Sequence, residues 1–332
     1  MIRGTSWVLA GSVAVAVSAC GGSRSVAGVA AQSASALHQG PITDFVPAAG
    51  LRWMVVARPK ELLQDQNVHQ GIDKLFPNAR LDGFAKNSGI DLRQLGVGCV
   101  AGFDIGTLYL AETAGVQPIE QAFLGRLASD PVTQHPGPGV VHITGLIGVT
   151  PESFVGLSNR MVGVSVKDPT LTKIVGAFAL GKLKKSPSSL AGAALGSLPK
   201  TLAIDPLQFY APGPFADEWT KGAHGLLGAS IAVGITGRIN APGYLDALAI
   251  LEGDYGSDSE LTMKRALATY QDLAQSGLGR VLGLGDERVA PEIKTTPTEV
   301  TLRVRLPLKH LLDGLYAAVA ANVWEMLEYK PR

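Results

Sequence analysis

The sequence predicts an α+β fold built of mainly antiparallel sheets, with helices on one face. Two observations carry this prediction: strand-like segments come in closely spaced pairs typical of hairpins, and helical segments stand between the pairs. In addition, residues 42–190 and residues 191–332 show the same order of elements: strand, helix, strand pair, helix, further strands, helix. We therefore expect two similar α+β halves, joined by the Ser-, Gly- and Ala-rich residues 186–198.

In the first half, the best-marked element is a helix over residues 170–184. Asp168 is a favoured N-cap residue and Pro169 is accepted in the first turn. Leu171, Val175 and Phe178 then recur at helical spacing. The other elements expected in this half are strands at 52–57, 97–103, 107–112, 140–148 and 161–166, and helices at 59–76 and 118–128.

In the second half, the clearest strand is the segment VTLRVRL, residues 300–306, because apolar and polar side chains alternate along it. The clearest helix covers residues 257–276, where Ser257 and Glu260 form a capping-box pattern and Gly277 offers a stop. The remaining expected elements are a strand at 207–210, a helical stretch at 217–227, a strand pair at 230–239 and 245–252, further strands around 291–306, and a last helix from residue 308.

Composition limits the classes of function. The chain of 332 residues has 29 Lys and Arg against 28 Asp and Glu, so its formal net charge is only +1. A near-neutral chain lacks the positive field that dominates binding to nucleic acid, and we expect no nucleic-acid partner. Of its two cysteines, Cys99 lies in the apolar segment VGVGCVAGF, which predicts a buried, unreactive thiol.

The N-terminus has the pattern of an export signal. Arg3 supplies a positive charge, and an apolar run follows over residues 7–17. This run is about half of the ~20 residues that a transmembrane helix needs, whereas the apolar region of a signal peptide is normally that short.

The apolar run ends in Val17-Ser18-Ala19-Cys20, which resembles the lipobox of bacterial prolipoproteins. The resemblance implies cleavage between Ala19 and Cys20 and a diacylglycerol attached to the Cys20 sulfur. Residues 1–19 are then a lipoprotein signal peptide, and the mature chain is held to a membrane through lipidated Cys20. Several acyl chains on one residue are enough for stable anchoring.

The segment after Cys20 fits an anchored protein. Residues 20–41 are rich in Gly, Ser, Ala and Gln, a composition that predicts a flexible tether. Gly21 stands where an Asp would favour retention in the inner membrane in the sorting rule of this class. The expected location is thus the bacterial cell envelope, at the outer membrane, facing the periplasm or the cell surface. The body is similar to uncharacterised envelope lipoproteins with a duplicated α+β unit.

Residues 42–332 contain no recognisable catalytic, cofactor or metal motif. Ser165 lies in GVSVK, where Lys167 replaces the second glycine of a nucleophile elbow. His135 and His142 lack the further ligands that zinc requires. The glycine-rich residues 277–285 follow a helix instead of a strand, which favours a connecting loop over a dinucleotide site. We expect no catalytic residues, cofactor or metal.

These observations favour a non-catalytic envelope lipoprotein that binds a partner or supports structure. A carrier or sensor of an apolar small molecule is the alternative, and a hydrolase that uses carboxylates or His142 is a less favoured third hypothesis. The segment FYAPGPF, residues 209–215, and the nearby Trp219 offer aromatic side chains to a protein partner. The candidate partner contacts are Phe209, Tyr210, Phe215 and Trp219, although ordinary core packing is the simpler account of all four.

Overall fold

The computed structural model describes residues 37–128, 131–158, 160–183, 195–202, 205–215, 222–286 and 289–320. Cys20, the lipobox and the tether up to residue 36 lie outside these ranges, so the expected signal peptide and lipid anchor stay predictions. No helix in the described ranges is both long enough and apolar enough to cross a membrane.

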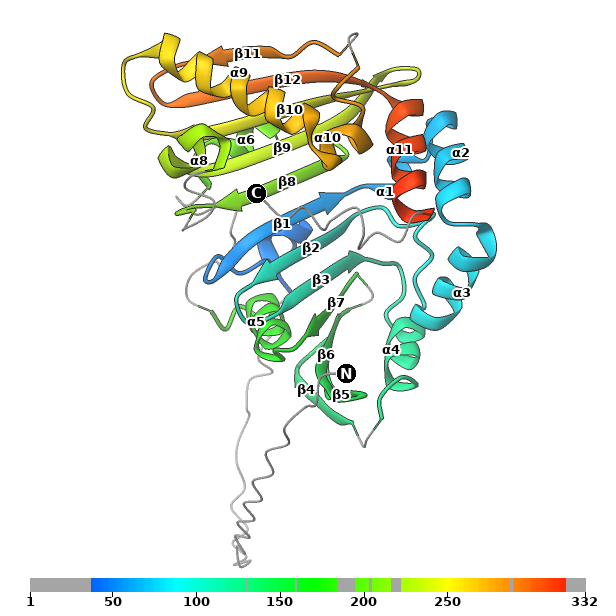
Figure 1. Cartoon of the computed structure of the whole chain (residues 1–332). Helices are drawn as coiled ribbons and strands as arrows, with labels where there is room; N and C mark the ends of the chain where they lie inside the picture. The colour runs from blue at the N-terminus through cyan, green and yellow to red at the C-terminus, as the bar shows by residue number, and fades with distance from the viewer. Residues whose placement is uncertain are drawn as a thin grey trace, which may run out of the picture. The chain divides into compact units, whose positions relative to one another are not determined.

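The described body contains twelve strands and a set of mostly short helices (Figure 1). The strands are β1 (Leu51–Ala57), β2 (Gly98–Phe103), β3 (Thr107–Glu112), β4 (Val132–Gly137), β5 (Val140–Ile147), β6 (Thr150–Leu157), β7 (Met161–Val166), β8 (Leu207–Pro212), β9 (Ser230–Ala241), β10 (Tyr244–Gly253), β11 (Glu292–Thr295) and β12 (Glu299–Pro307). The helices are η1 (Ile42–Phe45), α1 (Pro59–Leu62), α2 (Gln66–Leu75), α3 (Asn78–Ser88), α4 (Gln117–Leu124), α5 (Thr170–Ala179), α6 (Leu198–Leu202), η3 (Gly222–Gly225), α8 (Leu226–Ala229), α9 (Ser259–Gln275), α10 (Gly277–Leu282) and α11 (Leu308–Ala320).

All the strands join one antiparallel sheet in the order β11-β12-β10-β9-β8-β1-β2-β3-β7-β6-β5-β4. The α+β class predicted from the sequence is confirmed. The two expected halves meet where β1 pairs with β8. From this junction the strand order is β1-β2-β3-β7 on one side and β8-β9-β10-β12 on the other, so each opening strand is followed by a hairpin and then by a later strand. This is a likeness in strand order, and the duplication itself stays a prediction.

The helices pack on both faces of the sheet, whereas the sequence analysis placed them on one. We call the face that carries Met54 and Cys99 the first face, and η1, α5 and α6 cover it. On the opposite, second face, α4 covers β6 and β7, and α9 and α10 cover β10 and β12. The physical reason is visible in β6, where the neighbouring residues Phe154 and Val155 point to opposite faces and are both fully buried.

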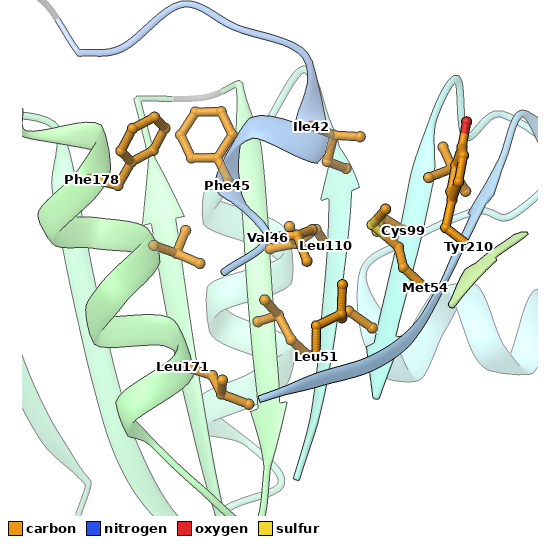
Figure 2. Close-up of a cluster of buried hydrophobic side chains, with 14 of the residues drawn as sticks. Ile42, Phe45, Val46, Leu51, Met54, Cys99, Leu110, Leu171, Phe178 and Tyr210 are labelled. Carbon is orange, nitrogen blue, oxygen red and sulfur yellow. The ribbon is translucent and has the colours of Figure 1, made fainter. Parts of the chain in front are cut away.

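The main core lies on the first face (Figure 2). Phe45 of η1 and Phe178 of α5 meet edge to face, with 5.4 Å between ring centroids. Cys99 lies in this core beside Met54 and is 2% exposed, as the sequence predicted. Burial raises the pKa of the Cys99 thiol to about 12, so the thiol stays protonated and unreactive at neutral pH.

Several elements differ from the sequence-based expectation. The predicted helix 59–76 is divided into α1 and α2, because Asp65 accepts hydrogen bonds from the amides of Asn67 and Val68 and starts a new helix. Strands β4 and β6 were not expected; β4 is an edge strand whose side chains are almost all exposed, so it shows no apolar alternation. The expected helix 217–227 is represented in the described residues only by η3 and the start of α8.

The predicted start of α9 and the loop predicted after it were also wrong, whereas its end at residues 275–276 was predicted correctly. The N-cap is Asp258, whose Oδ1 accepts from the Leu261 amide at 2.9 Å, and not Ser257. After α9, Ser276 caps the six-residue helix α10, where we expected a loop. The glycine-rich segment therefore starts a helix, but it follows α9 and not a strand. The context that a dinucleotide site requires is still missing.

Candidate ligand-binding site

The structure separates the four aromatic residues that were expected to contact a partner. Tyr210 is fully buried on the first face, where its hydroxyl donates to Gln208 Oε1 at 3.1 Å. It cannot contact a partner in the folded protein, and its proposed role was wrong. Phe209 points to the second face and is half-buried, and Phe215 is also half-buried. Trp219 lies outside the described residues.

His142 lies beside hydroxyl groups, but inside the core. Its Nε2 is 2.9 Å from Thr172 Oγ1, which is 2.5 Å from Ser153 Oγ, and Ser153 in turn is 2.7 Å from Ser165 Oγ. Ser165 completes the chain by donating to the Asp168 carbonyl at 2.7 Å. Burial, with a smaller effect of Lys173, lowers the pKa of His142.

This chain of hydroxyls does not form an active site. Ser153, Ser165 and Thr172 are fully buried beneath α5, and His142 is buried with them. A nucleophile must be free to reach a substrate, and these buried oxygens are already hydrogen-bonded to one another or to the backbone. The network satisfies polar groups that β5, β6, β7 and α5 bring into the core, which is the usual role of buried hydrogen bonds.

The largest pocket that we describe lies on the first face, beyond the end of α6. It has a volume of about 740 Å³, within the range typical of small-molecule sites. We call it the arginine pocket. Its lining residues are Thr201, Leu202, Asp205, Thr236, Arg238, Asn240, Asp246, Ala247, Leu248, Ala290, Glu292, Arg303 and Arg305.

Strand register builds the floor of the arginine pocket as two rows. In one row, Arg238 of β9 faces Asp246 of β10, which faces Arg305 of β12. In the row beside it, Thr236 faces Leu248, which faces Arg303. Because side chains alternate between faces, residues two apart on each strand point into the same pocket.

Helix α6 closes one side of the pocket because it lies very close to β9. Gly234 makes this possible, since a Cβ at this position would collide with the Leu202 side chain. Gly234 is two residues before Thr236 on the same face of β9. The close approach of α6 therefore explains why Thr236 is buried, with 2% of its surface exposed.

Two of the three carboxylates of the pocket already have close partners. Asp246 accepts from Arg305 Nε at 2.7 Å, from Arg305 Nη2 at 3.3 Å and from Asn240 Nδ2 at 2.6 Å. These hydrogen bonds hold the pKa of Asp246 below its usual value, and the bond from Arg305 has the largest effect. Glu292 is 2.7 Å from Lys294 Nζ, and this contact lowers the pKa of Glu292. Both carboxylates are thus ionised and paired at neutral pH.

Several hydrogen-bond donors of the pocket, by contrast, have no close partner. The Arg303 guanidinium makes no hydrogen bond or ion pair with any residue of the described ranges. Arg238 has only a long contact, 3.9 Å from Nη1 to Asp205 Oδ1. The buried Thr236 Oγ1 has no hydrogen-bond partner among the described atoms. It is the only buried side-chain nitrogen or oxygen of the described residues that lacks one. A buried hydroxyl without a partner is rare and costs free energy, so it calls for an explanation.

The sequence alone did not point to the arginine pocket. The polar face of residues 300–306 was recognised, but as an ordinary wet strand face. What brings Arg238, Thr236 and Arg303 together is the pairing of β9, β10 and β12, which are far apart along the chain. A usable signal is that each of the three strands carries at least one charged residue near one end: Arg238 on β9, Asp246 on β10, and Arg303 and Arg305 on β12.

A second exposed feature is apolar. The second face of β9, β8, β1, β2 and β3 has no described helix in front of it, as Figure 1 shows between α9 and α4. Large side chains on this surface are exposed: Trp53, Tyr109, Leu207, Ile231 and Ile235. We call this surface the central apolar face, and Phe209 lies on it. Patches of this kind often mark interaction sites, and a contact of Phe209 with a protein partner stays a prediction.

A smaller apolar pocket lies among α1, α2 and α3. Its volume is about 250 Å³, and its lining includes Leu63, Ile72, Phe76 and Leu81. This volume is below the range typical of small-molecule sites. Within the ranges that the structure covers, no group of three or more His, Cys, Asp or Glu side chains could hold a metal ion.

No protein-family model and no curated protein matches this sequence. Among solved structures, a crystal structure of TP0453 (crystal form I) is similar to the chain, with a TM-score of 0.43 and 8% sequence identity. The alignment covers 83% of this chain and 96% of TP0453. A likeness at this level says nothing about a binding site, so the functional proposal depends on the residues of this chain.

Proposed function

We propose that the protein is a lipid-anchored, non-catalytic component of the bacterial cell envelope whose body binds a small polar molecule in the arginine pocket. One observation carries the binding role: a buried threonine hydroxyl without a partner lines a pocket that also contains an unpaired arginine. A bound molecule would satisfy both groups at once. Thr236 is buried, where hydroxyl groups are otherwise paired, whereas Arg303 is exposed and its guanidinium is open to a molecule that arrives from solvent.

The anchoring part of the proposal is supported by the sequence. The lipobox pattern favours a lipid on Cys20, and residues 21–36, which are mostly small, would separate it from the described body. A tether of this composition would let the body stand clear of the membrane surface.

The non-catalytic part is supported by the chemistry of the pocket. Catalysis by a nucleophile requires a base within hydrogen-bond distance of it. Thr236 has no such partner in the described structure, and the serines near His142 are buried. The pocket offers groups that bind and orient a molecule.

The anchor is tested by the variant Cys20→Ser. In cells fed a labelled fatty acid, we expect the wild-type protein to take up the label and the variant to take up none, because the only thioether site is lost. The variant should also leave the membrane fraction. Cys99→Ser is the matched control and should label like the wild type, since Cys99 is buried. A Cys20→Ser protein that still labels and stays on the membrane would refute the anchor.

The binding role is tested on the purified mature lipoprotein in detergent. The protein is incubated with the small molecules extracted from envelopes of its own cells, washed and denatured, and the released compounds are identified by mass spectrometry. We expect polar compounds that the variant Arg303→Gln fails to retain. The control is Arg52→Gln, an exposed arginine paired with Asp104 outside the pocket. Recovery of apolar compounds alone, equally by all three proteins, would instead favour an apolar carrier.

A further inference from the structure

We infer that the molecule bound in the arginine pocket is a small organic anion, with its carboxylate or phosphate group on Arg303, its carbon body over Leu248 and an oxygen hydrogen-bonded to Thr236. This inference rests on the proposed function and names the chemical class of its ligand. The groups that face the pocket carry this assignment.

The first step is the balance of charges. Three carboxylates and three arginines line the pocket, so it is not basic by count. However, Asp246 is hydrogen-bonded to Arg305 and Asn240, and Glu292 forms an ion pair with Lys294. A cationic ligand would have to break the pairs of Asp246 and Glu292, and would find only Asp205 loosely held, 3.9 Å from Arg238. An anionic ligand finds Arg303, which makes no hydrogen bond or ion pair with any described residue and is only in the electrostatic field of Glu292, the residue that faces it on β11.

The second step is the nature of the spare donor. The guanidinium of Arg303 is planar and always charged, and it presents pairs of N–H groups that match the two oxygens of a carboxylate or phosphate. A neutral hydroxyl or amide could use only part of this fork. The free donors therefore favour an oxyanion over an uncharged polar group.

The third step is the distance between the two ends of the site. Thr236 and Arg303 lie in one row with Leu248 between them. Strands are about 4.8 Å apart, so the Cα atoms of the two outer residues are separated by about 10 Å. The long side chain of Arg303 reduces the distance that the ligand must span between the guanidinium and the Thr236 hydroxyl to a few bond lengths. Leu248 is half-buried and presents apolar surface there, which suits a short carbon chain and not a second charged group.

The last step concerns Thr236. Its hydroxyl can both donate and accept, so it can pair with a hydroxyl, carbonyl or carboxylate oxygen of the ligand. Thr236 and valine have nearly the same shape, and Val lacks the unpaired oxygen. If the hydroxyl serves only the ligand, its removal will weaken binding without loosening the empty protein.

The experiment uses the purified mature lipoprotein in detergent and two matched pairs of probes: succinate with succinamide, and glycerol 3-phosphate with glycerol. Binding is measured by calorimetry and by the rise in Tm that a ligand of the folded state produces. We expect an anionic member to bind at least tenfold more tightly than its neutral partner. The variant Arg303→Gln should bind the anionic probe at least tenfold more weakly than the wild-type protein does. Thr236→Val should weaken binding several-fold while leaving Tm without ligand unchanged or raised.

The outcomes separate this inference from the proposed function. Neutral probes that bind as tightly as the anions, or compounds recovered from envelopes that carry no carboxylate or phosphate, would overturn the anion assignment and leave a polar-ligand site in place. Full affinity in Arg303→Gln would overturn it as well. If wild-type protein binds no probe and retains no polar compound from envelopes, the proposed function fails with it. Arg52→Gln should behave as wild type throughout.

Discussion

Replacing Phe154 by alanine is expected to lower the free energy of unfolding by about 3–5 kcal/mol, the usual cost of deleting a buried phenylalanine side chain. Phe154 is on β6 and is fully buried on the second face of the sheet. Its ring stacks on Phe123 of α4, with 5.5 Å between centroids and 29° between planes. Alanine would leave a cavity beneath α4, and the helix would lose an aromatic contact that holds it to the sheet.

The matched control for this loss is Tyr109→Ala. Tyr109 is on the same face of the sheet, separated from Phe154 by β7 alone, and it is 45% exposed. Because its ring is already in contact with water, we expect its removal to cost less than about 1 kcal/mol. Urea unfolding of both variants, followed by circular dichroism, measures the difference. Equal losses would show that α4 does not depend on Phe154 for its position.

The sequence predicted those elements whose patterns are local. β12 was predicted because its apolar and polar residues alternate, and α5 was predicted because Asp168 and Pro169 precede a helical stripe. The structure has Pro169 at the N-cap instead of Asp168, and the carboxylate of Asp168, just before the helix, accepts from the Thr170 amide at 2.7 Å. The burial of Cys99 followed in the same way from its apolar neighbours. In each case the residues that decide the structure stand within a few positions of one another.

The features that escaped prediction depend on contacts between distant segments. Whether Phe209 or Tyr210 is buried depends on which face of β8 the helix α6 covers, and the sequence of the strand does not say. The arginine pocket depends on register: shifting β10 by one residue against β9 and β12 would turn Asp246 and Leu248 to the other face. Helices on both faces were missed because strands with two apolar faces, such as β6, were not recognised.

The buried hydroxyl network predicts that the protein loses stability as the pH falls below neutrality. In the folded state, burial lowers the pKa of His142, whereas in the unfolded chain the group has its ordinary value of about 6.5. Below that pH the unfolded chain binds more protons than the folded protein, so the free energy of unfolding decreases with falling pH. For one group the slope is at most about 1.4 kcal/mol per pH unit, and the loss continues until the pH reaches the lowered pKa.

This dependence can be assigned to His142 by comparing variants at pH 7.5 and pH 5.5. We expect the wild-type protein to be less stable at pH 5.5, and His142→Gln, which places an amide where Nε2 meets Thr172, to show a smaller difference between the two values. Glu152 acts in the opposite direction, because burial raises its pKa and the folded state then holds a proton more readily. Both proteins contain Glu152, so its contribution cancels when the pH-dependent change in stability of the variant is subtracted from that of the wild type. His135→Gln, on the exposed edge strand β4, is the control. An unchanged slope in His142→Gln would mean that the imidazole can take up a proton without opening the core, and that its bond to Thr172 does not hold α5 on the sheet.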